Sequence, residues 1–386
     1  MGEALTGING NIIRWARCRC NLSIEDAAKA IGIDVTKYSD IENGNEFPTY
    51  AKLKKIGEVF HKPTAIFFFS EPPSLPSIEG DLRTLSSDIV SGLSRNIIIQ
   101  MEKAKAYQIH LHDLYGERKS FLCDREKFPT DITELSNFIR SAIAFPVSAQ
   151  KARKNPKIVF EYFRNVLYDL GIYVFKDSFK DNSISGFCIN DDQYPIIVIN
   201  NSMSFARQNF TLFHELYHLI INTSGIEIIR DDYLELLEPK NQSYEKACDM
   251  FANEFLVPTS DFNKELSKYE LDDKRIAELA KLYSVSKEAI MYKLYSMNII
   301  SPDEYNDLKE FFYGDALRNN KDVKKENSGG GNYYFTKLSY LGTRYTSDVF
   351  KQYFSGNIDS FKASEMLGSK VDHLPNLETA FYRGIR

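Results

Sequence analysis

The spacing of apolar side chains predicts short helices at the start of the chain and short strands near its middle. Apolar residues recur every three to four positions over 11–20, 23–32, 35–43 and 48–60, as in amphipathic helices. Ser23 with Asp26 is typical of a helix start, and Gly32 and Gly44 are typical of helix ends. Apolar runs separated by turn residues predict three strands, Ile172–Lys176, Ile184–Ile189 and Ile196–Asn200.

Helical patterns dominate the rest of the sequence. They cover residues 85–118, 157–170, 204–222, 243–256 and 272–312. We therefore predict an α+β protein that is mostly α, with a small sheet in its core. The expected segments are an all-helical N-terminal module (1–76), a helical connector (77–130), a mixed core (131–260), a helical subdomain (261–313), a flexible linker (314–331) ending in Ser-Gly-Gly-Gly, and a small helical C-terminal domain (332–386).

Composition changes this picture in three respects. No apolar stretch approaches the roughly 18 residues of a membrane span, and no signal peptide is evident, so we expect a cytoplasmic protein without membrane contact. The five cysteines include no CxxC pair, which is typical of free thiols in a reducing compartment rather than of disulfides or a cysteine zinc site. The net charge of −5 excludes nucleic-acid binding driven by overall charge, so a local surface would have to provide it.

The sequence His214-Glu215-Leu216-Tyr217-His218 has the form H-E-x-x-H. On a helix, residues four apart share a face, so both imidazoles can reach one Zn²⁺ ion, and Glu215 can take a proton from a water bound there. The alternative is an ordinary helix with a polar edge. The apolar residues around the motif favour the metal, because two unpaired histidines and an acid inside a protein are costly.

A catalytic zinc needs a third protein ligand. The other histidines lie in the N-terminal half or beyond the expected linker, whereas Glu245 and Asp249 share one face of the helix over 243–256. Glu245 can bind the metal while Asp249 holds the free N–H of a ligand imidazole. The alternative is an amphipathic helix whose acids face solvent.

The stretch from Arg207 to Leu219, followed by Glu245-x-x-x-Asp249-x-Phe251-Ala252-Asn253 and Pro258, resembles the ImmA/IrrE family of metallo-endopeptidases. The resemblance implies a gluzincin-like core with one Zn²⁺ on His214, His218 and Glu245, and Glu215 as the base. Two departures are Tyr217, where glycine is frequent, and Cys248-Asp249, where Ala-Asn is frequent; neither is expected to touch a ligand.

Substrate contacts are less specified by the sequence. Peptidases of this type add the substrate as a strand to a sheet edge, and Ile184–Ile189 is our candidate for that edge. Tyr194, Arg207 and Tyr217 are candidates for stabilising the oxyanion of the transition state, and the sequence does not choose among them.

The N-terminal helices resemble an XRE-type helix-turn-helix, on the residues Ala27-Ala28, Ile31-Gly32, Val35–Gly44 and Pro48-Thr49. The resemblance implies that Thr36 and Lys37 reach base edges, and Arg14 and Arg17 are the candidate phosphate contacts. Residues 1–70 hold nine Lys/Arg against eight Asp/Glu, so a module that docks a partner protein is the alternative to DNA binding. A second helix pair at 274–300 has a similar shape, and packing beside the core is its simpler interpretation.

The resulting hypothesis is a zinc endopeptidase that cleaves a specific bacterial regulatory protein, a repressor or antitoxin, in a stress, mobile-element or toxin–antitoxin context. The alternative is a non-proteolytic helix-turn-helix regulator or antitoxin that binds DNA or a cognate toxin, with a structural zinc. An intact Glu215 favours the enzyme, because a structural metal site does not need that acid.

Overall fold

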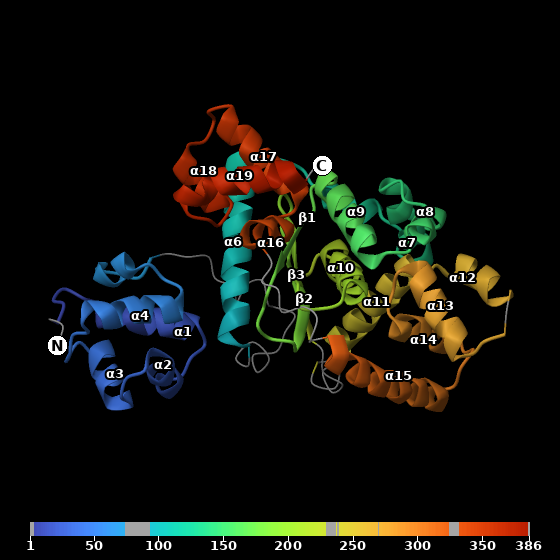
Figure 1. Ribbon diagram of the computed structural model, residues 1–386, viewed down its shortest axis with the longest axis horizontal. Helices are drawn as coiled ribbons and strands as arrows, with labels where there is room; N and C mark the ends of the chain where they lie inside the picture. Colours follow the sequence, from blue (N-terminus) through green and yellow to red (C-terminus); the bar gives the residue numbers. More distant parts are fainter. Residues whose placement is uncertain are drawn as a thin grey trace. The chain divides into compact units, whose positions relative to one another are not determined.

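A computed structural model describes residues 4–73, 93–228, 237, 239–268, 270–323 and 332–384, with 313–323 described by their backbone alone. The chain divides into two compact units. The first comprises Met1–Ala106 with Phe179–Asp181, and the second comprises Tyr107–Ser178 with Asn182–Arg386. The structure is mostly helical with one small sheet, which confirms the predicted α+β class (Figure 1).

The first unit is helical. Its elements are α1 (Gly10–Arg19), α2 (Ile24–Ile31), α3 (Val35–Glu42), α4 (Tyr50–Phe60) and a 3₁₀ turn, η1 (Thr64–Phe68). As predicted, Ser23 accepts a hydrogen bond from the backbone N–H of Asp26 at the start of α2, and Gly32 ends that helix with φ of 75°. Apolar residues of the four helices and η1 form one core. The helix boundaries predicted in this region are correct to within two residues.

Helix α6 (Arg95–Tyr115) begins in the first unit and ends in the second. It lies within the single long helix predicted for 85–118, whose residues 85–92 are outside the described part of the chain. Apolar side chains are buried along it at Ile97, Met101, Ala104 and Leu111.

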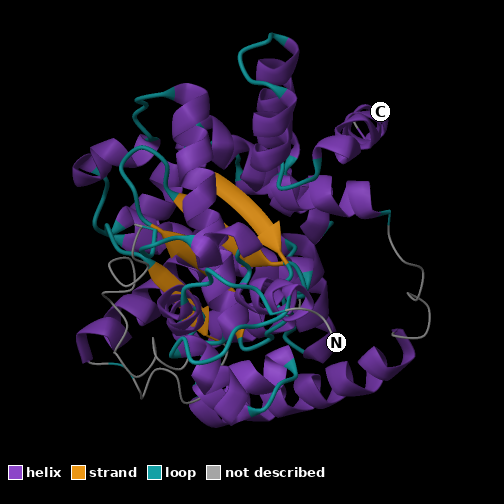
Figure 2. Cartoon of the chain, turned by 90° about the vertical axis from the view of Figure 1, so that its left-hand side faces the viewer, coloured by secondary structure: helices purple, strands orange, loops and turns teal. Residues whose placement is uncertain are grey.

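Four strands form the sheet of the second unit in the order β1-β3-β2-β4. Figure 2 shows the strands in orange among the helices. β1 (Tyr173–Asp177) pairs in parallel with β3 (Ile196–Asn200), and β2 (Ile184–Ile189) pairs antiparallel with both β3 and β4 (Gly225–Ile228). The three predicted strands are present within one residue. The expectation that β2 forms an edge is wrong, because both of its sides are already paired.

The fourth strand explains this error. β4 is only four residues long and contains Gly225 and Glu227, so its sequence lacks the apolar run that marks the other strands. It becomes a strand through its pairing with β2, a contact between residues that are 37 to 44 positions apart in the chain. The sheet order makes β4 an end strand.

Helix α10 (Phe205–Ile220) packs on the sheet and is itself covered by two other helices. It contacts β2, β3 and β4, and also α9 (Pro156–Asp169) and α11 (Pro239–Leu256) (Figure 1). At Gly186 of β2, a Cβ atom would lie 2.5 Å from the methyl carbon of Thr211, so only glycine permits this close approach of helix and strand.

The other helices of the second unit surround this centre. They include η2 (Phe121–Lys127), α7 (Ile132–Ala142), α8 (Val147–Arg153), α12 (Thr259–Leu266), α13 (Asp273–Tyr283), α14 (Lys287–Ser296) and α15 (Pro302–Val323). Helix α7 contacts α11 directly, and α13 pairs with α14 as expected for the helix pair at 274–300. Their apolar residues join those of α9, α10 and the sheet in one core.

The expected linker at 314–331 overlaps the end of α15. Its residues 314–323 continue α15, because a single glycine at 314 costs a helix only about 1 kcal/mol and helix-forming residues follow it. Residues 324–331 lie outside the described part of the chain. The remaining segment boundaries stay predictions.

The C-terminal helices belong to the second compact unit. They are α16 (Tyr333–Leu341), α17 (Thr343–Phe354), α18 (Ser360–Met366), η4 (Val371–His373) and α19 (Leu374–Gly384). Helix α16 contacts β1, and the buried guanidinium of Arg164 on α9 donates to the carbonyl of Ser339 at 2.7 Å.

Lys176 of β1 is buried and lies 3.3 Å from the Glu161 carboxylate. Burial lowers the pKa of its ammonium group to about 8, more than the nearby Glu161 raises it. The folded state therefore disfavours the charged form, and this penalty should disappear as the pH rises from about 8 through the unfolded value of about 10.4.

We predict that Lys176→Met raises the free energy of unfolding by about 3 kcal/mol at pH 7 and by far less at pH 10. Denaturant titrations of both proteins across this range measure the difference. A difference that stays constant with pH would contradict the prediction.

Candidate metal centre

Helix α10 brings the residues of the H-E-x-x-H motif to its contact with the sheet and α11. The helix begins at Ser204, whose side chain accepts a hydrogen bond from the backbone N–H of Arg207. His214 and His218 lie one turn apart with ring centroids separated by 5.1 Å, and each is only 2% exposed. Glu215 is fully buried beside them.

Helix α11 brings both predicted acids to these imidazoles. Glu245 lies between the two rings, with Oε2 at 3.1 Å from Nε2 of His214 and Oε1 at 3.4 Å from Nε2 of His218. Asp249 Oδ1 lies 3.0 Å from Nδ1 of His214. Two ligand atoms on one tetrahedral zinc lie roughly 3 to 4 Å apart, and both distances from Glu245 to the Nε2 atoms fall in this range.

The other nitrogen of each imidazole is held from outside the cluster. Asp249 holds Nδ1 of His214, and the hydroxyl of Thr223 lies 3.2 Å from Nδ1 of His218. Thr223 also donates to the His218 carbonyl at 3.0 Å. Such contacts fix the orientation of a ring and direct the opposite nitrogen toward a metal. Asp249 was predicted in this position, whereas Thr223, which lies in the turn after α10, was not.

Gly225 gives His218 the space that its ring occupies. A Cβ atom at this position would lie 2.6 Å from Cδ2 and 2.8 Å from Nε2 of the imidazole. Real Cβ atoms do not approach other atoms so closely, so the first residue of β4 has to be glycine for the ring to keep its place.

Burial and the neighbouring groups act in opposite directions on the pKa values of the site. It would lower the pKa of both imidazoles, but Cys248 and the surrounding acids raise the pKa of His214 and His218 well above its ordinary value. Burial likewise opposes ionisation of Glu245, yet the adjacent imidazoles of His214 and His218 hold the pKa of its carboxyl at about 2. The cluster therefore stabilises a carboxylate at Glu245 and favours positive charge between the two helices.

Glu215 has a different environment. Neither of its carboxylate oxygens has a hydrogen-bond partner among the described residues, and burial raises the pKa of the group. Nε2 of His218 is also buried without an aligned hydrogen bond in the described part of the chain. Groups of this kind are costly to bury alone, and a divalent cation bound between the imidazoles and Glu245 would compensate them. The residues present therefore fit a metal ion.

Two cysteines lie next to this cluster, contrary to the expectation that Cys248 touches no proposed ligand. The Cys248 sulfur and one nitrogen each of His214 and His218 lie within 4.8 Å of one another. Cys188 of β2 lies close enough to Glu215 to influence the pKa of its carboxyl. All described cysteines are free thiols, as predicted. Tyr217, the other departure from the family pattern, packs against Phe251 with ring centroids 5.2 Å apart.

Two of the three oxyanion candidates, Tyr194 and Arg207, have hydrogen-bond partners within the protein. The Tyr194 hydroxyl donates to the carbonyl of Gly116, so it is already engaged. Arg207 Nη2 donates to Glu227 Oε1 at 2.5 Å. One carboxylate oxygen of Glu227 lies within 4.8 Å of ligand atoms of His214 and Asp249, so these three residues could hold a metal ion. Arg207 is therefore connected to the residues of the metal centre through one side chain, that of Glu227. Glu227 lies on the unpredicted strand β4, and no local sequence pattern indicated its role.

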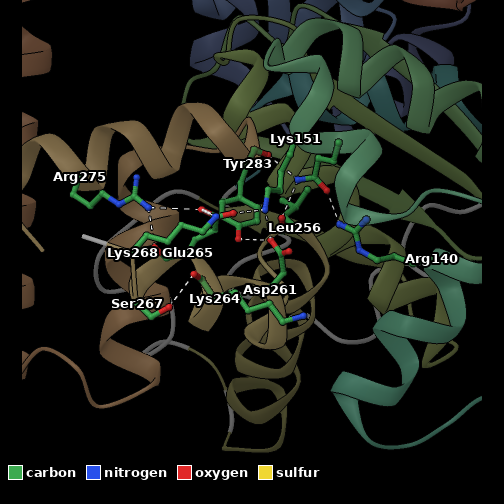
Figure 3. A network of polar contacts seen from close by, with 11 residues as sticks. Arg140, Lys151, Leu256, Asp261, Lys264, Glu265, Ser267, Lys268, Arg275 and Tyr283 are labelled. Atoms are coloured by element: carbon green, nitrogen blue, oxygen red, sulfur yellow. Dashed lines mark hydrogen bonds and ion pairs between the residues drawn. The ribbon is translucent and has the colours of Figure 1, made fainter. Parts of the chain in front are cut away.

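Buried polar groups fix the C-terminal end of α11, where backbone carbonyls have no partner within the helix. Arg140 of α7 donates from Nε to the Phe255 carbonyl at 3.0 Å, and Gln150 donates to the carbonyls of Leu256 and Tyr283 at 2.9 and 2.7 Å. Figure 3 shows this network continuing through Asp261, which accepts hydrogen bonds from Lys151 and Tyr283. The helix that carries Glu245 is therefore anchored to α7, α8 and α13.

In the first unit, the candidate DNA contacts divide into two groups. Thr36 and Lys37 are exposed in the first turn of α3, and the Arg14 side chain is 49% exposed. Arg17 is directed inward, where Nε and Nη2 donate to the buried Glu42 carboxylate at 2.7 and 3.0 Å. Its expected contact with phosphate is at odds with this arrangement, because the guanidinium already neutralises an internal charge.

A helix with two histidines and an acid, packed on a small sheet and facing a carboxylate on a second helix, defines the class of metallopeptidases. Residues 168–295 match the family described as the IrrE N-terminal-like domain, and residues 13–67 match a helix-turn-helix family. The chain therefore carries an IrrE-like metallopeptidase domain preceded by an XRE-type helix-turn-helix domain. The match implies a divalent metal.

Two curated relatives are named radiation response metalloprotease IrrE. The protein of Deinococcus radiodurans is 33% identical over 107 residues, which are 27% of this chain and 32% of the relative. That of Deinococcus deserti is 29% identical over 107 residues, 27% of this chain and 37% of the relative. The chain thus matches about a third of the length of these relatives. A solved structure of a Mycobacterium tuberculosis transcriptional regulator aligns with a TM-score of 0.29 and 16% identity, covering 45% of this chain and 49% of the regulator.

Among the described helices, none combines the length and apolarity needed to cross a membrane.

We predict that Gly225→Ala lowers the affinity for zinc about 10- to 100-fold, because the new methyl group displaces the His218 ring. Competition with a chromogenic chelator measures the affinity. Gly384→Ala is the control, since its Cβ would make only an ordinary contact of 3.8 Å with Phe335. Equal zinc affinity in both variants would contradict the role given to Gly225.

Proposed function

We propose that this protein is a zinc-dependent endopeptidase that hydrolyses a peptide bond in a specific bacterial regulatory protein, a repressor or an antitoxin. One observation carries the proposal: the Glu215 carboxylate is buried without a hydrogen-bond partner among the described residues, directly beside two imidazoles that share Glu245. A purely structural metal site has no use for this acid. The substrate class follows from the combination of a peptidase domain with a helix-turn-helix domain, which is typical of regulatory proteins.

In this proposal His214, His218 and Glu245 hold the zinc, and Asp249 and Thr223 orient the imidazoles. Zinc, when bound, supplies a Lewis acid and lowers the pKa of a water molecule to about 7. Glu215 takes the proton of the attacking water on a carboxylate oxygen and delivers it to the nitrogen of the leaving amine. Burial raises the pKa of Glu215, which suits a group that both accepts and returns a proton near neutral pH.

The sharpest test of the enzyme is Glu215→Gln. This variant should retain stoichiometric zinc, because Glu215 is not a ligand, and should lose cleavage by about 10²- to 10⁴-fold, because the amide accepts no proton. Elemental analysis and cleavage of candidate repressors from its own locus measure the two properties. Glu278→Gln, which alters a half-exposed acid on α13, is the control.

Variants of the ligands complete the test. His214→Ala, His218→Ala and Glu245→Ala should each lose zinc. Zinc-loaded wild-type protein that leaves every candidate repressor intact would refute the substrate class, and zinc-free protein purified without chelators would refute the metal centre.

A second function is a non-proteolytic regulator or antitoxin that binds DNA or a cognate toxin around a structural zinc. The Cys248 thiol favours it, because two histidines, an acid and a cysteine provide the four protein ligands of a closed site. The two functions differ in their response to Glu215→Gln, which leaves a regulator fully functional and inactivates a peptidase.

The N-terminal domain is proposed to bind DNA through α3. Thr36 and Lys37 are exposed at the start of this helix, where a recognition helix presents side chains to the major groove. The pairing of Lys37 with Glu46 at 3.3 Å is between exposed groups and is therefore weak enough to be exchanged for DNA.

We predict that Lys37→Ala weakens binding to DNA from its own promoter without lowering the melting temperature. Arg17→Ala should instead destabilise the domain by about 3 to 5 kcal/mol, because it leaves the buried Glu42 charge with a weaker set of partners. Electrophoretic mobility shifts and thermal melting distinguish the two effects. Unchanged DNA affinity in Lys37→Ala would favour a protein-docking role for this domain.

A further inference from the structure

Cys248 lies on α11 between the two acids of the metal centre. It follows Glu245 by three residues, so both side chains lie on the face of the helix that packs against α10. The thiol is fully buried, and its sulfur lies within 4.8 Å of one nitrogen of His214 and one of His218. These are the same two imidazoles that Glu245 contacts.

A second observation points to a ligand at this place. His218 is 2% exposed, and its Nε2 atom has no aligned hydrogen bond in the described part of the chain. The Glu245 oxygen at 3.4 Å is close to it but not aligned as an acceptor. A buried ring nitrogen between a carboxylate and a thiol has the surroundings of a metal-binding atom rather than of a core histidine.

We propose that Cys248 is a fourth protein ligand of the metal, bound through its thiolate together with His214, His218 and Glu245. Zinc accepts sulfur, nitrogen and oxygen ligands in a tetrahedral arrangement, and a cysteine, two histidines and a carboxylate fill all four positions. Metal binding deprotonates the thiol, whose proton leaves to solvent. The four ligand residues come from two helices that pack against each other, α10 and α11.

The consequence is a resting state that is closed to water. A catalytic zinc keeps one position for water, and in this chain the thiolate takes that position. Glu215 then has no metal-bound water beside it until Cys248 leaves the metal. Binding of Cys248 to the metal explains why the cluster contains both the acid Glu215 and four potential ligands. The peptidase is then latent while Cys248 is bound.

This inference rests on the metal centre of the proposed function and is tested independently of proteolysis. Cobalt(II) is loaded in place of zinc under reducing conditions, and the near-ultraviolet absorption is recorded, because thiolate ligands give an intense charge-transfer band that imidazole and carboxylate do not. The wild type should show the band. Cys248→Ala should bind one cobalt ion and lack it.

Cys188→Ala is the matched control, since Cys188 is also buried near the site but lies beside Glu215 on the sheet. It should keep the band. Cys248→Ser provides a second variant of nearly wild-type volume if alanine disturbs folding, which circular dichroism monitors. Cobalt bound by the wild type without the band, or a band that persists in Cys248→Ala, would overturn the ligand assignment.

The rate of cleavage tests the latent state. Zinc-loaded Cys248→Ala should cleave a candidate repressor severalfold faster than the wild type, and equal rates would overturn the closed resting state. Protein that takes up no cobalt at all would overturn the metal centre and the ligand assignment together. Cobalt binding with the charge-transfer band, but without cleavage by any variant, would leave Cys248 a ligand and count against the peptidase alone.

Discussion

The contact between α10 and α11 places two imidazoles and two acids in a region from which water is largely excluded, and the rest of the second unit is arranged around this constraint. Burying charged or polar groups costs several kcal/mol unless they find partners. Glu245 lies 3.1 Å from Nε2 of His214 and 3.4 Å from Nε2 of His218. Glu215 and Nε2 of His218 have no aligned hydrogen bond among the described residues. A cation between the helices satisfies the whole group, which is why metal binding and folding of this region are expected to be coupled.

Close contacts on two sides restrict the positions of helices α10 and α11. Toward the sheet, Gly186 and Gly225 allow α10 and the His218 ring to approach closer than any side chain would permit. On the far side, Arg140 and Gln150 occupy the carbonyls at the end of α11, so that this helix is held by buried hydrogen bonds as well as by apolar packing. Positions held in this way favour a site whose ligands are preorganised before the metal arrives.

The charged side chains of the helix-turn-helix domain form a buried set and an exposed set. Arg17 and Glu42 form an ion pair that is largely buried, with the Tyr38 hydroxyl donating to the same carboxylate at 2.6 Å. This pair organises the domain and leaves Arg14, Thr36 and Lys37 as the exposed candidates for a partner. The contact between α1 and α3 cannot be read from the sequence. It makes Arg17 a structural residue and leaves Arg14 exposed for a binding partner.

The sequence by itself determined the helices of the first unit, three of the four strands, and the H-E-x-x-H helix, because these depend on local caps, periodicity and spacing. It also indicated Glu245 and Asp249, since residues four apart share a helix face. Only the tertiary structure decided that β4 completes the sheet, that α15 extends into the expected linker, and that Cys248, Thr223 and Glu227 adjoin the histidines. Their roles depend on contacts between segments distant in the chain, and no local pattern of side chains encodes such contacts.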